Sequence, residues 1–279
     1  MYQYATLAHT SYEQITECFN LAFSDYTLPV AMRAEQLRQY FEMCGVERDL
    51  SCGAFINGQL VGFIFYVSGI YQGQRTVFDV GTGVIPVHRG KQVCSHLFAF
   101  AEERLAQVVD NSYLEVLQQN TRAIRLYKRH GFAIKREYVV LRSSGMAAQD
   151  EIFSVKEKDF SQFDLRTVEH CISPQPSFEH CTDVLRKNPH LYGVRYWERE
   201  EQISAFCIFR RQNGAIIQLG YQDLSDLRRI VQGIQAEYSD VTVKNIDGTY
   251  SQLLDMLLSL GFREAARQFE MCKRLIPVD

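Results

Sequence analysis

The stretch from residue 83 to residue 95 reads Gly83-Val84-Ile85-Pro86-Val87-His88-Arg89-Gly90-Lys91-Gln92-Val93-Cys94-Ser95. An apolar strand is predicted to loosen from its neighbour at Pro86, because proline cannot donate to a sheet ladder. The chain then turns through Arg89-Gly90-Lys91 and enters a helix. Unpaired backbone N–H groups, the positive end of the helix dipole and two cations meet at this turn. The stretch therefore predicts a pyrophosphate site beside a strand edge that can take an extended ligand.

A second motif follows at 120–132, where the chain reads Asn120-Thr121-Arg122-Ala123-Ile124-Arg125-Leu126-Tyr127-Lys128-Arg129-His130-Gly131-Phe132. Asn120, Ala123 and Tyr127 are spaced by three and four residues, so they share one face of a helix. Gly131 is predicted to end that helix.

Together the two motifs strongly resemble the signature of the GNAT superfamily of acetyl-coenzyme A-dependent N-acetyltransferases. That signature is a strand ending V-x-P, a loop R-G-x-G-x-G or -A, then N-x-x-A-x-x-L/F-Y and G-F. The matching positions are Val84, Pro86, Arg89, Gly90, Asn120, Ala123, Leu126, Tyr127, Gly131 and Phe132. The resemblance covers roughly residues 2–142. It implies an α/β (α+β) fold, in which a mixed, mostly antiparallel twisted sheet is flanked by helices.

The resemblance implies acetyl-coenzyme A as cosubstrate and no metal. The backbone of Val84 and Ile85 would hold the pantetheine arm and orient the thioester. The pyrophosphate would be cradled by the loop residues Arg89, Gly90, Lys91, Gln92, Val93, Cys94 and Ser95. Asn120 would either orient the cofactor or cap its own helix.

Two loop residues depart from the family pattern, because Gln92 replaces its second glycine and Cys94 takes the small-residue position. Glycine lets a phosphate approach the backbone closely. Gln92 lies at a helix start, where we expect any residue to adopt the backbone shape, and its amide could donate to a phosphate. We therefore expect weakened rather than abolished binding of coenzyme A.

Catalysis needs a proton donor for the leaving thiolate and a base for the amine. Tyr127 matches the family's general acid, a role that contributes about 10²–10⁴-fold, although a tyrosine at this spacing can also simply pack against the sheet. The base is either Asp79, in the strand leading to Val84, or Glu115, in the strand before the Asn120 helix. Either could instead be a solvated or ion-paired carboxylate, with a water relay as a third route. Strand periodicity alone does not say which faces the cleft.

The remaining pattern predicts strands and helices in two similar halves. The first half reads as a strand at 2–7, helices from Ser11 and over 33–44, hairpins at Asn57-Gly58 and Gln72-Gly73, then helix, strand, helix and strand. After a small, polar linker at 143–151, a hairpin at Asn213-Gly214 precedes helix, strand, helix and a closing strand. Aligning Gly131-Phe132 on Gly261-Phe262 gives an offset of 130 residues.

We infer a duplication, with a GNAT domain carrying the acetyl-coenzyme A site at 1–145 and a degenerate GNAT-like domain at 146–279. At the strand-to-helix turn of the second domain stands Asp223, which would repel a pyrophosphate. Leu257 falls opposite Tyr127, and Tyr250 opposite Asn120. The second domain is therefore expected to lack the coenzyme A loop and the chemistry, and to cover or extend the acceptor cleft of the first.

Composition excludes other classes of protein. The 279 residues carry 30 Lys and Arg against 33 Asp and Glu, a net charge of −3 that argues against a nucleic-acid binder. No apolar stretch is long enough for a membrane span, and the N-terminus lacks a signal-peptide pattern. The eight cysteines are far apart, which favours free thiols and a cytoplasmic protein.

Two Glu-His-Cys tripeptides, at 169–171 and 179–181, have a spacing that does not favour a metal site.

The sequence thus predicts a tandem N-acetyltransferase that moves acetyl from acetyl-coenzyme A to a primary amine of a small-molecule or peptide acceptor by direct attack. The acceptor would lie between the first two helices and the hairpin loops, near Tyr26 and Tyr71. The alternative is a non-catalytic coenzyme A-binding or scaffold protein with the same fold. Transfer to a hydroxyl, or of a longer acyl group, stays open, as does the choice between monomer and homodimer.

Overall fold

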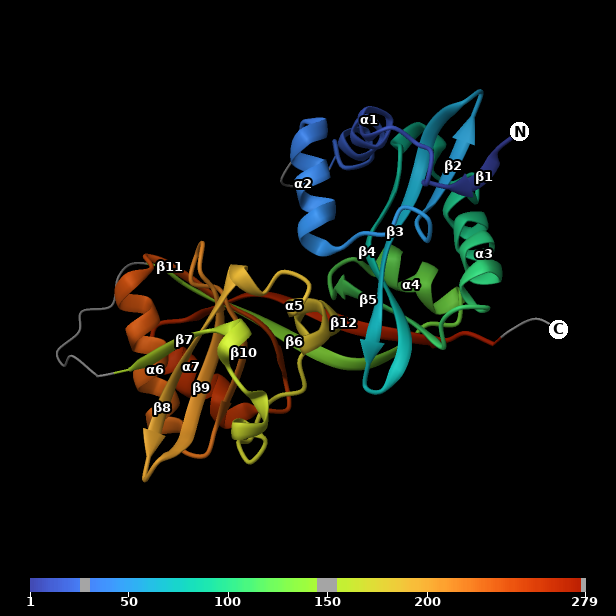
Figure 1. Cartoon of the computed structure of the whole chain (residues 1–279). Coiled ribbons are helices and arrows are strands. Elements are labelled where there is room, and N and C mark those ends of the chain that lie inside the picture. The colour runs from blue at the N-terminus through green and yellow to red at the C-terminus, as the bar shows by residue number, and fades with distance from the viewer. Residues whose placement is uncertain (26–30, 145–154, 277–279) are drawn as a thin grey trace. The chain divides into compact units, whose positions relative to one another are not determined.

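The computed structural model describes residues 1–25, 31–144 and 155–276 (Figure 1). The chain forms two compact units that interleave along the sequence. Unit 1 comprises Met1–Val116, Asn120–Ala133 and Met271–Asp279, and unit 2 comprises Leu117–Gln119 and Ile134–Glu270. Tyr26 and the linker from residue 145 onward lie outside the described residues. The boundary at residue 145 refers to two duplicated stretches of sequence and stays a prediction.

Unit 1 is built on a mixed sheet, as the sequence predicted. Its strand order is β1 (Gln3–Thr6), β2 (Cys52–Ile56), β3 (Gln59–Tyr71), β4 (Gln74–Val84), β5 (Asn111–Leu117) and then β12 (Arg263–Arg274), of which residues 271–274 belong to this unit. The pairs from β1 to β4 are antiparallel, and β4 pairs with β5 in parallel.

Short-range sequence signals set the ends of the unit 1 helices. These helices are α1 (Tyr12–Ala22), α2 (Ala34–Cys44), α3 (Val93–Leu105) and α4 (Thr121–Arg129). Ser11 Oγ accepts a 3.3 Å hydrogen bond from the amide of Gln14 and caps α1. Gly45 and Gly131, with φ of 71° and 83°, end α2 and α4 in the left-handed region that glycine tolerates.

The two faces of the unit 1 sheet carry different helices. Phe63 and Phe65 of β3 pack with residues of α1 and α2 in one hydrophobic cluster. Tyr66, the next residue along β3, points to the other face, where it lies near Phe98 of α3. Side chains on β4 can therefore be assigned to the α1 face or to the α3 face from their register with β3.

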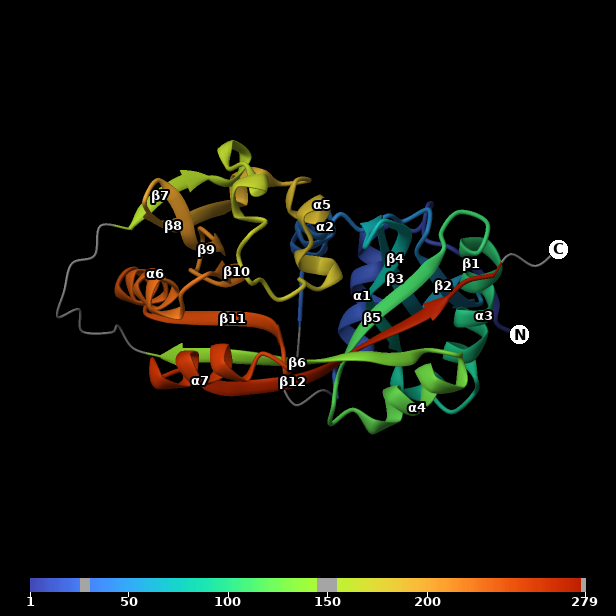
Figure 2. The same ribbon diagram turned by 90° about the horizontal axis from the view of Figure 1, so that it is seen from below.

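Unit 2 repeats this order with its own strands and helices. The strands follow one another as β12, β6 (Ala133–Ser144), β11 (Asp240–Asp247), β10 (Ile216–Tyr221), β9 (Gln202–Arg210), β8 (Tyr192–Arg199) and β7 (Lys156–Asp159). The helices after β10 and β11 are α6 (Leu224–Glu237) and α7 (Ser251–Ser259). Figure 2 shows β6 running beside β12 and β11. Between β7 and β8, where unit 1 has α1 and α2, the chain forms short 3₁₀ turns and α5 (Thr182–Leu185), which the sequence did not predict.

The last strand of each half lies where local sequence could not place it. Strand β6 follows α4 of unit 1, yet pairs with β11 of unit 2. The end of β12 belongs to unit 1, where Met271 and Cys272 are buried and the amide of Leu275 donates to Asp110 O at 2.9 Å. Both strands were predicted, but their exchange was not.

Candidate functional site

Strands β4 and β5 separate within the sheet of unit 1. Their parallel register runs from Thr76–Asn111 to Asp79–Leu114, whereas β4 stays paired with β3 as far as Val84. The amide of Ile85 donates to Val61 O of β3 at 2.9 Å. Because successive N–H groups along a strand point to opposite edges, the amide of Val84 points away from β3. Strand β4 therefore has an open edge that begins directly after Asp79.

The first turn of α3 offers further backbone donors next to that edge. The helix starts at Val93, later than the predicted start at Gly90, and its first bond is from the amide of His96 to Gln92 O at 3.0 Å. The amides of Val93, Cys94 and Ser95 precede this bond, and the first turn holds no acidic residue. Gly90 has φ of +75° and open space where a side chain would project. The turn can therefore approach an anion closely with its backbone.

Gln92 adopts a left-handed backbone, with φ of 59° and ψ of 12°. The expectation that any residue fits this position is therefore wrong. A residue with a Cβ crowds the following carbonyl in this conformation, at a cost of roughly 1–2 kcal/mol. Glycine, which the family pattern has here, adopts this backbone shape without that cost.

The Arg89 side chain links the turn to the end of β4 and to the end of α1. Its Nε donates to Val84 O at 2.9 Å and its Nη2 to Ala22 O at 2.7 Å. Its Nη1 forms an ion pair with Asp25 Oδ2 at 2.5 Å, and this contact lowers the pKa of the Asp25 carboxyl. The guanidinium expected to bind pyrophosphate is thus bonded to β4 and to the end of α1. Lys91 is the exposed cation of the turn.

Several ionisable groups surround Tyr66, which is fully buried on the α3 face. Tyr66 stands opposite Asp79 in the β3–β4 register. Burial raises the pKa of its hydroxyl well above 10, and the charges of Asp79, Cys94 and Tyr127 act in the same direction. The fold thus brings together three residues predicted from separate motifs. Sequence analysis missed Tyr66, because only the register that follows from the Gln72-Gly73 turn places it here.

Asp79 is a buried carboxylate at the point where the two strands part. Its side chain is 7% exposed, and Thr82 Oγ1 donates to its Oδ2 at 2.6 Å. Within the described residues, its Oδ1 has no hydrogen-bond partner. Burial raises the pKa of this carboxyl to about 7, although the Thr82 hydroxyl and the Gly81 amide favour the charged form. Asp79 can therefore exchange a proton near neutral pH.

The other predicted base, Glu115, points to the opposite face of the sheet. Asp79 pairs with Leu114, so these two side chains share the α3 face. Glu115 is the next residue along β5 and alternation turns it toward the α1 face, where it is half-buried. The register thus separates two candidates that sequence periodicity could not.

The second motif lies on α4 as predicted. Tyr127 is 8% exposed, and its ring packs edge-to-face against Phe98 and Phe132, with centroid distances of 5.7 and 6.0 Å. Asn120 Oδ1 accepts a 3.1 Å hydrogen bond from the amide of Ala123. Of the two roles left open for Asn120, the structure shows capping of α4.

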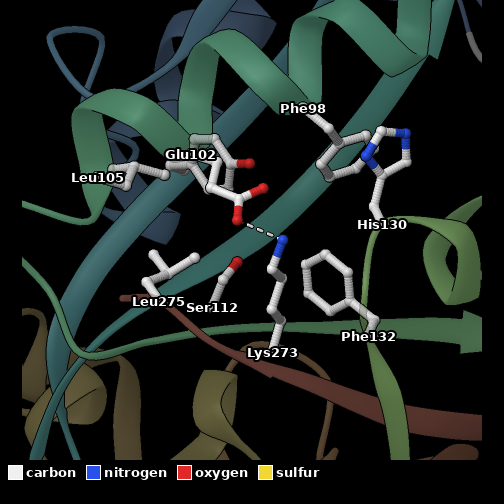
Figure 3. A pocket seen from close by; sticks show the side chains of 9 residues that line it. Phe98, Glu102, Leu105, Ser112, His130, Phe132, Lys273 and Leu275 are labelled. Carbon is white, nitrogen blue, oxygen red and sulfur yellow. Dashed lines mark ion pairs between the residues drawn. The ribbon is translucent and has the colours of Figure 1, made fainter. Parts of the chain in front are cut away.

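A small pocket lies beside Tyr66 on the same face. Figure 3 shows the ion pair between Glu102 of α3 and Lys273 of β12, with Ser112 beside it and His130 against the ring of Phe98. Burial lowers the pKa of the His130 imidazole in this pocket.

The thiol of Cys94, in the first turn of α3, is also affected by burial, which raises its pKa to about 12. Cys94 is therefore a neutral thiol at physiological pH, which argues against a covalent thiolate mechanism.

Comparison with known proteins identifies this arrangement. Residues 12–132 match the sequence model of the Acetyltransferase (GNAT) family, which spans both motifs and the separated strands. The segment from residue 12 to residue 132 is a GNAT acetyltransferase domain. No curated protein matches the chain by sequence.

Solved structures extend the GNAT likeness to the whole chain. A GCN5-related N-acetyltransferase from Sphaerobacter thermophilus aligns over 100% of this chain and 97% of its own, with a TM-score of 0.69 and 17% identity. A GCN5-related N-acetyltransferase from Anabaena variabilis aligns over 99% of this chain and 73% of its own, with a TM-score of 0.63 and 12% identity. A tandem GNAT protein from the clavulanic acid biosynthesis pathway aligns over 100% of both chains, with a TM-score of 0.64 and 12% identity. The chain therefore has a tandem GNAT fold.

The remaining sequence predictions concern metals and membranes. His170 bonds to Ile203 O and His180 to Ser177 Oγ, at 2.9 and 3.2 Å. In the described ranges, no three His, Cys, Asp or Glu side chains are grouped to hold a metal ion. Among the helices of the described residues, none is long and apolar enough to cross a membrane.

Proposed function

We propose that unit 1 is an N-acetyltransferase that moves acetyl from acetyl-coenzyme A to a primary amine of a small-molecule or peptide acceptor. The observation that carries this proposal is Asp79, a carboxylate with a pKa near 7 at the point where β4 and β5 part. A general base works best when its pKa lies near the operating pH.

The residues present fit acetyl-coenzyme A. The outward amide of Val84 can bond to the pantetheine arm, whereas that of Ile85 is bonded to Val61. The backbone from Gly90 to Ser95 supplies donors for the pyrophosphate at the α3 N-terminus. Lys91 adds a positive charge there. The strained backbone at Gln92 lowers this affinity without closing the site.

Acetyl-coenzyme A supplies an activated thioester, and the chain's own residues manage the protons. Charged Asp79 accepts a proton from the ammonium form of the acceptor, directly or through water, which frees the amine to attack. Tyr127 donates a proton to the leaving thiolate, whose pKa is about 8.5 as for a free thiol. Glu115 is the alternative base, favoured by its position on the α1 face, where the acceptor is expected.

The test compares Asp79→Asn with Glu115→Gln and Tyr127→Phe in steady-state kinetics over a panel of amines. We expect Asp79→Asn to lower kcat by about 10²–10⁴-fold and to abolish the rise of rate with pH near 7. Tyr127→Phe should lower kcat with little change in affinity for acetyl-coenzyme A. If Glu115→Gln alone removes the pH dependence, Glu115 is the base; unchanged rates in all three variants would reject the mechanism.

The strained Gln92 favours a second candidate, a non-catalytic coenzyme A-binding protein. Calorimetric titration of acetyl-coenzyme A separates the two when it is combined with the amine panel. Binding with turnover supports the enzyme, binding without turnover supports the sensor or scaffold, and no binding rejects both.

A further inference from the structure

Unit 2 contains a copy of the strand gap found in unit 1. Strands β10 and β11 pair in parallel only at Ile216–Val243, and a bulge follows in β10. In unit 1 the last parallel pair, Asp79–Leu114, is likewise followed by a bulge in β4. Ile216 therefore corresponds to Asp79.

The correspondence continues to the end of both strands. Gly220 stands opposite Phe206 in β9, as Gly83 stands opposite Phe63 in β3. Tyr221, the residue after Gly220, is thus the counterpart of Val84, the residue after Gly83. The amide of Gln222 donates to Ser204 O of β9 at 2.7 Å, so the amide of Tyr221 points away from β9, into the gap.

In unit 2 the chain itself occupies this edge. The amide of Ile172 donates to Tyr221 O at 2.8 Å, and the amide of Tyr221 donates to Ile172 O at 3.0 Å. These bonds form an isolated antiparallel bridge. The amide of Tyr221, the counterpart of the outward Val84 amide, is therefore already paired, and its carbonyl accepts a bond from Ile172 as that of Val84 does from Arg89 Nε.

The rest of the segment 172–180 is seated between the two strands. Gln218 of β10 donates to the carbonyl of His180, and Asn245 Nδ2 of β11 donates to Ser177 Oγ at 3.2 Å. Ser177 is fully buried. A side chain added at Gly220 would overlap Ser173, so the segment also packs directly on the β10 backbone.

The N-terminus of α6, the helix that follows β10, is capped by a carboxylate of the chain itself. Asp223 Oδ1 accepts from the amide of Ser225 at 2.8 Å at the start of α6. Asp226, buried in the first turn, pairs with Arg199 at 2.5 Å and Arg229 at 2.6 Å. In α3 the same turn holds no acid, and its first amides precede the helical bonds. An anion at α6 would meet two carboxylates instead of free donors.

We propose that unit 2 is a self-occupied copy of the acyl-coenzyme A site. The segment 172–180 lies in place of a pantetheine arm, and Asp223 lies in place of the pyrophosphate. The whole chain therefore binds one acyl-coenzyme A, at unit 1. The nature of the displaced ligand rests on the function proposed for unit 1, whereas the occupancy of the gap does not.

Amide hydrogen exchange of the full chain tests this proposal, because Val84 and Tyr221 form a matched pair of amides. Without ligand, we expect the Tyr221 amide to exchange at least about 100-fold more slowly than that of Val84, since it is bonded to Ile172. Saturating acetyl-coenzyme A should slow exchange at Val84 and leave Tyr221 unchanged. Calorimetry on the same protein should give one site per chain.

Variants at Ile172 identify the bond responsible. Ile172→Pro removes one of the two bonds of the bridge, from the amide of Ile172 to Tyr221 O. The remaining bond from the Tyr221 amide to the carbonyl of residue 172 should then open more often, so exchange at Tyr221 should accelerate at least about 10-fold. Ile172→Ala keeps both backbone bonds and loses a side chain that is 53% exposed, so it should exchange as the wild type does. Circular dichroism establishes that both variants are folded.

Three results would overturn the proposal: fast exchange at Tyr221 in the ligand-free wild type, protection of Tyr221 on addition of acetyl-coenzyme A, or two sites per chain. Absence of coenzyme A binding at unit 1, which rejects both functions proposed for it, looks different. In that case acetyl-coenzyme A protects neither amide, while slow ligand-free exchange at Tyr221 still supports the occupied gap.

Discussion

Arg89 and Asp25 form an ion pair at the turn whose cations the sequence assigned to phosphate binding, with 2.5 Å between Nη1 and Oδ2. Arg89 is 24% exposed on its side chain, and its other nitrogens bond to Val84 O and Ala22 O. The pair ties the end of β4 to the end of α1. Arg89 thus shapes the turn, and its charge is partly neutralised before any ligand binds.

Removing Arg89 should weaken binding of acetyl-coenzyme A through the shape of the turn. We expect the double variant Arg89→Ala/Asp25→Asn, which removes both charges of the ion pair, to raise the Kd about 10-fold or more while the salt dependence of binding changes little. Lys91→Ala is the matched comparison. Because Lys91 is exposed, its loss should flatten the salt dependence. Titration calorimetry at two ionic strengths measures both, and a steep loss of salt dependence in the double variant would assign the phosphate contact to Arg89.

Replacing Gln92 by glycine should tighten cofactor binding. Glycine adopts a φ of +59° without strain, so Gln92→Gly should stabilise the turn by about 1 kcal/mol and lower the Kd for acetyl-coenzyme A up to about fivefold.

Gln72, in the hairpin between β3 and β4, is a control because it also has a positive φ, of +52°, but lies outside the turn at Arg89–Gln92. Gln72→Gly should raise the melting temperature to a similar extent without changing the Kd. Equal affinity of wild type and Gln92→Gly would show that strain at Gln92 does not limit binding.

Asp79→Asn should stabilise the protein at neutral and higher pH. The pKa of Asp79 is raised from 3.8 to about 7, so the native state binds more protons than the unfolded state between these values. Stability contributed by this group is complete below about pH 4 and is lost as pH rises toward about 7. Asparagine carries no charge to bury, so the variant should unfold at higher denaturant than wild type at pH 8 and similarly at pH 4.

The same variant should lose activity where it gains stability, because the charged form serves as the base. Denaturant unfolding at the two pH values, combined with kinetics at pH 8, measures both effects. A variant less stable than wild type at pH 8 would show that the Asp79 carboxylate stabilises the fold in its charged form.

Unit 1 should require the C-terminal strand. A chain ending at Glu270 lacks Met271 and Cys272, both buried, and the Lys273 ammonium that pairs with Glu102 (Figure 3). Loss of one buried methionine side chain alone costs about 2–5 kcal/mol. We expect this chain to lose acetyl-coenzyme A binding and the cooperative unfolding of unit 1. A chain ending at Ile276 keeps the strand and should behave as the full chain; if the shorter chain binds equally well, the end of β12 from Met271 to Arg274 is dispensable for unit 1.

The sequence by itself determined the elements and motifs whose interactions lie within a few residues. Ser11 capping α1 and Gly131 ending α4 involve neighbours within a few positions, so local residue types suffice, whereas for Asn120 the sequence left two roles open. The family pattern likewise located the turn at Arg89-Gly90 and the tyrosine on α4, because its residues are close in the chain.

Only the tertiary structure decided which groups meet and what charge they carry. Tyr66 faces Asp79 through the strand register, and the raised pKa of Asp79 comes from burial under residues distant in sequence. The left-handed backbone of Gln92 is a property of the folded turn that residue propensity does not predict. The exchange of β6 and β12 and the seating of segment 172–180 in the β10–β11 gap are pairings between distant stretches, which compete with alternatives that local sequence cannot rank.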